Sequence, residues 1–192
     1  MVKRKHIPIG RPSLLIGVWL LASIVLLGAV PSVQAGSGGF QHRVQTAFIY
    51  KFFKFIEWPD AKGAAATGPI RIGVLGPGPM AEALEEIDGK TFRGRKIAVE
   101  PLSSLEAAGE FQVVFIHSSH SQEWEAVRDL LKSHPVLTVG DWKGFGERGG
   151  ILNFYLVSNK VRFQINYEEA KKAGLTISSK VLKLAQIVKT RP

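Results

Sequence analysis

The sequence predicts an α/β fold: one domain with a largely parallel sheet of about six strands, helices on both faces and an antiparallel hairpin at the C-terminus. Strand-like and helix-like segments alternate through the middle of the chain, from Ile70 to Val139, as they do in parallel sheets. Further on, residues 152–165 alternate apolar and polar side chains on both sides of a Ser-Asn pair, which is the pattern of a hairpin.

The first 35 residues are expected to be a cleavable secretory signal peptide rather than part of the fold. A basic leader precedes an uncharged apolar run, Leu14 to Val30, and Pro31 and a small-residue pattern ending at Ala35 follow at the spacing of a cleavage site. An uncleaved membrane anchor is the alternative, because the apolar run is close to the length that spans a bilayer. The domain then comprises residues 36–192, and we expect it in the periplasm.

The composition limits the chemistry of the exported chain. It contains no cysteine, which excludes disulfides, thiol catalysis and a lipoprotein anchor. Without the four basic residues of the leader, its formal charge falls from +9 to +5. Because this excess is scattered and an exported protein rarely meets nucleic acid, we expect it to serve solubility or attraction to an acidic partner surface.

The domain is expected to begin with an aromatic-rich helix over residues 41–58, which Pro59 ends. The apolar residues of its stripe recur every three to four positions: Val44, Phe48, Phe52 and Phe55. The stripe is wide, so the helix is expected to pack on more than one side. A core helix is the usual outcome of such a pattern, and a helix lying on a membrane surface is the alternative.

Strands and helices then follow in alternation. We expect strands at 70–75, 96–101, 112–117 and 135–139, and helical segments at 80–87, 103–108 and 121–133, the last capped by Ser121. The strand at 112–117 is almost entirely apolar, as expected when both faces of a strand are covered. A glycine-rich loop, residues 140–150, leads to the hairpin.

The hairpin has a well-defined register. With the turn at Ser158–Asn159, six apolar side chains fall on one face in three cross-strand pairs: Leu156 with Val161, Phe154 with Phe163 and Leu152 with Ile165. A shift of one residue would turn this apolar set towards water.

Two helices are expected after the hairpin. Asn166 caps the first and Gly174 ends it. Ser178 caps the second, whose apolar residues recur at helical spacing: Val181, Leu184, Ala185 and Val188.

The edge where the strands end is the candidate ligand pocket, because open parallel sheets bind ligands beyond the carboxyl ends of their strands. Three loops follow these strand ends, at residues 76–79, 117–121 and 140–150. Gly76, His117 and Trp142, one from each loop, are the candidate ligand contacts. The first loop does not match a nucleotide-binding glycine motif, and its two prolines lack the N–H donors that a phosphate needs. His117 and His120, with Glu123 nearby, could be metal ligands, but a strand end that leads into a helix cap commonly contains Ser and His and explains them more simply. We therefore expect no cofactor and no metal.

Two surfaces are candidates for contact with a partner protein. Trp142 and Phe145 in the glycine-rich loop either anchor a partner or plug the open end of the core, and the sequence favours neither alternative. Tyr155 and Arg162 lie on the polar face of the hairpin. No serine-elbow, zinc-helix or cysteine-nucleophile motif is present, and the carboxylate pairs lie on helices without facing geometry. We expect a binding protein rather than an enzyme.

Several segments in order resemble the YfiR family of exported proteins, over about 140 residues. The matching segments are 57–59, which contains Trp58, then 72–76, 136–141, 149–154, 161–166 and 177–185. The resemblance implies a periplasmic, non-enzymatic α/β domain, often a homodimer. It also implies binding to the periplasmic part of a membrane diguanylate cyclase, which is held inactive, so that cyclic-di-GMP signalling and biofilm formation are restrained. Trp58 joins the candidate contacts, and a periplasmic small-ligand sensor is the alternative function.

Overall fold

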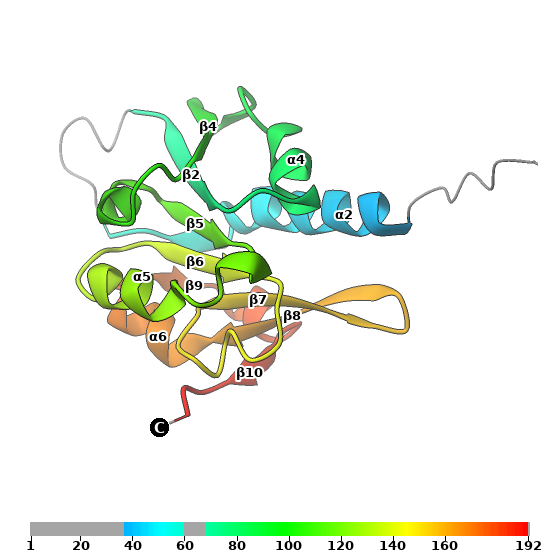
Figure 1. Cartoon of the computed structure of the whole chain (residues 1–192), viewed down its shortest axis with the longest axis vertical. Helices are drawn as coiled ribbons and strands as arrows, with labels where there is room; N and C mark the ends of the chain where they lie inside the picture. The colour runs from blue at the N-terminus through cyan, green and yellow to red at the C-terminus, as the bar shows by residue number, and fades with distance from the viewer. Residues whose placement is uncertain (1–36, 60–67, 192) are drawn as a thin grey trace, which may run out of the picture. The chain divides into compact units, whose positions relative to one another are not determined.

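The described residues, 37–59 and 68–191, are built around one eight-stranded sheet in this computed structural model (Figure 1). Its strands in chain order are β2 (Ile70–Leu75), β3 (Thr91–Phe92), β4 (Arg95–Pro101), β5 (Val113–Ile116), β6 (Leu137–Gly140), β7 (Leu152–Val157), β8 (Lys160–Asn166) and β10 (Gln186–Val188). Across the sheet, the order is β10-β8-β7-β6-β5-β2-β4-β3. The signal peptide predicted for residues 1–35 lies outside the described residues.

Most neighbouring strands of this sheet run parallel, which confirms the predicted fold class. The antiparallel pairs are β7 with β8, the C-terminal hairpin, and β3 with β4. The short strands β3 and β10 were not expected from the sequence, so the sheet is larger than predicted. A separate two-stranded antiparallel sheet joins β1 (Ile56–Glu57) to β9 (Thr176–Ile177).

Helices cover both faces of the large sheet, as predicted. They are α2 (Ser37–Phe52), α4 (Pro79–Glu85), α5 (Trp124–Leu131), α6 (Tyr167–Lys172) and α7 (Ser179–Leu182), with the 3-10 helices η2 (Glu106–Glu110) and η3 (Ser118–His120). Strand β5 shows the two faces directly: Phe115 lies in the cluster under α2 and α4, whereas Val114 and Ile116 lie in the cluster under α5 and η2. All three side chains are fully buried, which explains the uninterrupted apolar sequence of this strand.

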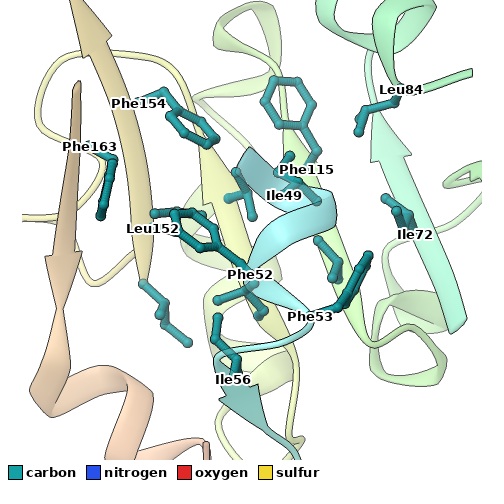
Figure 2. Close-up of a cluster of buried hydrophobic side chains, with 14 of the residues drawn as sticks. Ile49, Phe52, Phe53, Ile56, Ile72, Leu84, Phe115, Leu152, Phe154 and Phe163 are labelled. Carbon is teal, nitrogen blue, oxygen red and sulfur yellow. The ribbon is translucent and has the colours of Figure 1, made fainter. Parts of the chain in front are cut away.

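The larger core lies under α2, whose buried side chains gather around the strands (Figure 2). Phe52 packs against Phe163 of the hairpin with ring centroids 5.2 Å apart, and Phe48 lies 5.7 Å from the same ring. Burial of each such side chain stabilises the fold by about 1.5–3 kcal/mol. The aromatic stripe is therefore core, packed on several sides as expected.

Helix α2 ends earlier than the sequence predicted. It runs to Phe52, and tighter turn bonds follow from Lys54 N–H to Lys51 O and from Phe55 N–H to Phe52 O. The chain then becomes extended, because Ile56 pairs with Ile177 in the small sheet. A distant strand partner, rather than Pro59, sets the end of the helix.

The hairpin has the predicted register in full, and its turn lies at Ser158–Asn159. Both turn residues adopt left-handed backbone angles, with φ of 47° and 61°, which suits the twist of a two-residue hairpin. After the hairpin, Asn166 caps α6 by accepting a hydrogen bond from the N–H of Glu169 (3.2 Å). Gly174 ends the segment with φ of 74°, as predicted.

The final helix and one cap were predicted wrongly. Ser178 caps α7 as expected, but α7 ends at Leu182 and residues 186–188 form β10, which pairs in parallel with β8. The β10 pairing satisfies backbone groups of β8 that would otherwise form an open edge. Ser121 does not cap α5, because η3 and a turn intervene and α5 begins at Trp124. Among the described residues, no helix is long and apolar enough to cross a membrane.

Candidate functional site

The carboxyl ends of β2, β5 and β6 meet at one edge of the sheet. Their last residues are aligned, because Leu75 pairs with Ile116 and Ile116 pairs with Gly140. The residues that follow these strands, Gly76, His117 and Asp141, therefore leave the sheet side by side. The sequence placed its candidate ligand pocket at this edge, which we call the carboxyl edge.

Two histidines close over the first loop of the carboxyl edge. Gly76 adopts φ of 94°, and an added Cβ there would collide with the Nδ1 atom of His120. At Gly78, an added Cβ would lie 2.8 Å from Nε2 of His117. Glycine is required at both positions because the imidazoles pack directly on the backbone. The loop is thus a tightly packed turn, in agreement with its poor match to a phosphate-binding motif.

Ser119 joins the two histidines. Its Oγ lies 2.9 Å from Nδ1 of His117 and 2.8 Å from Nδ1 of His120. Its backbone N–H also donates to Nδ1 of His117 (3.2 Å), so this nitrogen is an acceptor and the neutral ring carries its proton on Nε2. By accepting this hydrogen bond, the His117 side chain caps the start of η3.

The interior side of the carboxyl edge is polar. Asp141 is partly buried, and loss of water raises its pKa above the ordinary value, while His117 and His42 act in the opposite direction when their imidazoles are protonated. Gln45 and Thr46 of α2 are almost completely buried. Gln45 Oε1, Thr46 Oγ1 and His42 Nδ1 have no hydrogen-bond partner among the described residues. Buried polar atoms of this kind normally bind ordered water.

Phe145 plugs the end of the core. Its side chain is fully buried, 4.6 Å from the ring of Trp124 and 5.1 Å from the ring of Trp142. Gly140 leaves the room it needs, because a Cβ there would lie 2.8 Å from the Phe145 ring. Trp142 is partly buried, and the Arg148 guanidinium lies over its ring, 5.2 Å from the ring centroid. Of the two alternatives for this pair, the burial favours the plug for Phe145 and leaves part of Trp142 on the surface.

The polar face of the hairpin is exposed towards the turn, whereas Asn153 near the start of β7 is buried. Tyr155 is paired across the strands with Arg162, and Asn153 Nδ2 donates to Gln164 Oε1 (3.1 Å) beside them. Arg162 is exposed and Tyr155 is half-buried. These two sequence-predicted residues are therefore together, but on a different part of the molecule from Trp58.

Trp58 lies at the opposite edge of the sheet, where the strands begin. Its Nε1–H donates to the carbonyl of Gln112, just before β5 (3.2 Å). With Phe92 and Arg93, it lines a hollow of about 650 Å³. No sequence pattern indicated this hollow, because its walls include strand beginnings that are far apart in the chain. No group of three or more His, Asp or Glu side chains among the described residues is arranged to hold a metal ion.

A second feature was also missed: an apolar tip. Phe40 in the first turn of α2 is 66% exposed, and Leu156 and Val157 at the end of the hairpin are 46% and 49% exposed. The alternating pattern placed Leu156 on the covered face, but α2 packs on the hairpin only from Phe48 onward, where the ring contacts Phe154.

The sequence model of the YfiR/HmsC-like family matches residues 42–186. The comparison with curated proteins gave no match. Among solved structures, the chain is similar to a conserved domain protein from Vibrio cholerae O1 biovar El Tor, with 16% identity and a TM-score of 0.56. It is also similar to an ABC domain in complex with L-Trp from Streptococcus pneumonia, with 12% identity and a TM-score of 0.50. Each alignment covers 77% of this chain and 60% of the other chain, and shows similarity of fold alone.

Proposed function

The chain belongs to the YfiR/HmsC-like family, whose members are periplasmic regulators, and from this premise we propose that it represses a membrane-bound diguanylate cyclase. It binds the periplasmic part of the cyclase and holds the enzyme inactive. Cellular cyclic-di-GMP and biofilm formation are lowered as a result. Residues 1–35 direct the chain to the periplasm and are then removed.

The family match over residues 42–186 carries this proposal, because it spans almost all of the described chain. The site geometry is compatible with it. The carboxyl edge is filled by His117, His120 and the Phe145 plug, so a large substrate would have little room there. Arg162, Tyr155 and the exposed part of Trp142 are surface groups of the types enriched in protein interfaces.

The proposal is tested by deleting the gene and measuring cellular cyclic-di-GMP. The level rises if the protein is a repressor, and a plasmid copy of the wild-type gene restores it. In parallel, a crosslinker placed on Arg162→Cys recovers the partner from the membrane, because the chain has no other cysteine. The proposal fails if the level is unchanged and no membrane protein is crosslinked. The homodimer implied by the family stays a prediction, which sedimentation of the purified protein tests.

A periplasmic small-ligand sensor is the second candidate, and the hollow at Trp58 favours it. Its volume of about 650 Å³ and its aromatic and guanidinium walls, Trp58, Phe92 and Arg93, suit a small aromatic or anionic compound. A thermal-shift screen of amino acids, starting with L-Trp, tests this candidate, because a ligand of the native state raises the melting temperature. Trp58→Ala abolishes the shift if the hollow is the site, and Trp142→Ala abolishes it if the carboxyl edge is.

A further inference from the structure

We propose that the apolar tip, defined as Phe40, Leu156 and Val157 with the neighbouring cations Arg43 and Lys160, docks on an anionic lipid surface. The inference goes beyond the proposed function, since it holds whichever membrane protein is regulated. It begins with the exposure of three large apolar side chains, between 46% and 66%, at the ends of two separate elements. Leu156 and Val157 are consecutive strand residues and project from opposite faces of the protruding hairpin end, and exposed apolar groups of this kind mark interaction surfaces.

The position of Phe40 follows from the helix that carries it. Val44, Phe48 and Phe52 follow Phe40 at intervals of four, so the four side chains share one face of α2. Phe48 and Phe52 of this face pack on Phe163 of the hairpin. Figure 1 shows the start of α2 and the turn of the β7–β8 hairpin on the same side of the domain, and Leu156 pairs with Val161 close to that turn.

The charged residues that α2 and the hairpin contribute to the tip are cations. Arg43 is exposed one turn after Phe40, and Lys160 is exposed opposite Val157 in the hairpin. Neither has an ion-pair partner among the described residues. Residues 37–56 and 152–166 contain no Asp or Glu, and the positive end of the α2 dipole lies beside Phe40. Acidic side chains lie on neighbouring elements: Asp141 is close enough to His42 for their charges to interact, and Glu82 and Glu85 are on α4, which also contacts α2.

This combination fits an anionic bilayer better than the other occupants. Exposed Phe and Leu side chains with flanking Lys and Arg are the signature of interfacial membrane binding, in which apolar groups enter the headgroup region and cations contact the phosphates. A second copy of the chain would bring like charges together at the tip. A partner protein would need a matching acidic, hollowed surface, whereas a bilayer adapts to protruding side chains.

The test uses residues 36–192, which form one compact unit, and vesicles of phosphatidylglycerol and phosphatidylcholine in equal parts. We expect co-sedimentation with these vesicles, little with phosphatidylcholine alone, and weaker binding at high salt. The variant L156S/K160Q removes one apolar group and one cation from the tip. We expect its partition to fall by about fiftyfold, about tenfold for the side chain and about fivefold for the charge.

The matched control is L130S/K132Q, which removes the same two side-chain types from exposed positions at the end of α5, on the face of the sheet opposite α2. It should bind as the wild type does. If melting shows that L156S/K160Q is unfolded, F40S gives the answer, because Phe40 is mostly exposed and its loss should weaken binding by about tenfold.

The proposal is overturned if the wild type does not bind the anionic vesicles, or if the tip variant and the control lose binding equally. It is also overturned if the tip variants change only self-association, or only the cellular cyclic-di-GMP level without changing vesicle binding. The last result would assign the tip to a protein partner. Repression of the cyclase is measured separately, by gene deletion. A negative result for lipid binding therefore does not affect the proposal of repression, and a negative result for repression does not affect the proposal of lipid binding.

Discussion

Replacement of Phe145 by alanine separates a structural plug from a partner anchor. The side chain is fully buried between Trp124 and Trp142, at centroid distances of 4.6 and 5.1 Å. Truncation of a buried Phe costs about 3–5 kcal/mol, through lost burial and the cavity left behind. The surroundings have little freedom to collapse, because the glycines at 140 and 150 have no side chains to fill the space. We therefore expect a loss in the free energy of unfolding of about 4 kcal/mol.

Urea unfolding followed by tryptophan fluorescence measures this loss. The midpoint should fall while the slope of the transition is unchanged, because the folded state stays compact. Leu156→Ala is the matched control: it truncates an apolar side chain that is 46% exposed, so its cost should stay below about 1 kcal/mol. A loss of less than about 1 kcal/mol for Phe145→Ala, with impaired partner binding, would refute the plug and support the anchor.

Three further substitutions test other parts of the structure. Asp141→Asn should flatten the dependence of stability on pH. Burial raises the folded-state pKa of Asp141, so the contribution of this carboxyl group to stability is fully present below its ordinary pKa near 3.8 and is lost as pH rises through the folded-state pKa. Unfolding at a series of pH values measures this change. Above that window the variant should be the more stable protein. Ser158→Gly should raise the melting temperature by relieving a left-handed backbone (φ 47°) that costs about 1 kcal/mol, and a lower melting temperature would contradict the turn geometry. Asn166→Ala should lower the free energy of unfolding in urea by about 2–4 kcal/mol. The buried side chain donates to Gly146 O (2.9 Å) and Thr190 Oγ1 (3.0 Å) and also caps α6. A loss below about 1 kcal/mol would contradict this role.

The parts of the fold that follow from local pattern were predictable. The hairpin register depends on alternation within 14 residues and a turn between the strands, and Leu152, Phe154 and Phe163 found their expected partners. The meeting of the loops that begin at Gly76, His117 and Gly140 at the carboxyl edge also followed, because parallel strands end together. The hairpin is specified by neighbouring residues in the chain, and the carboxyl edge by the parallel topology that the strand–helix alternation predicts.

The parts that depend on distant partners were not predictable. Residues 181–188 fit a helical stripe, yet Gln186 pairs with Gln164 of β8 and the segment becomes a strand. Ile56 leaves α2 because Ile177 offers a strand partner 121 residues away. The hollow at Trp58 and the apolar tip each combine elements that meet only in the folded chain. The periodicity of apolar residues carries no information on contacts between segments that are far apart in the chain.

The central claim is that the exported domain represses a membrane diguanylate cyclase by contact from the periplasmic side. The most direct measurement adds purified residues 36–192 to spheroplasts of the deletion strain, whose periplasmic face is open, and follows cyclic-di-GMP. We expect the level to fall and to saturate with added protein. An unchanged level at saturating protein, with the domain shown to be folded, would contradict the account.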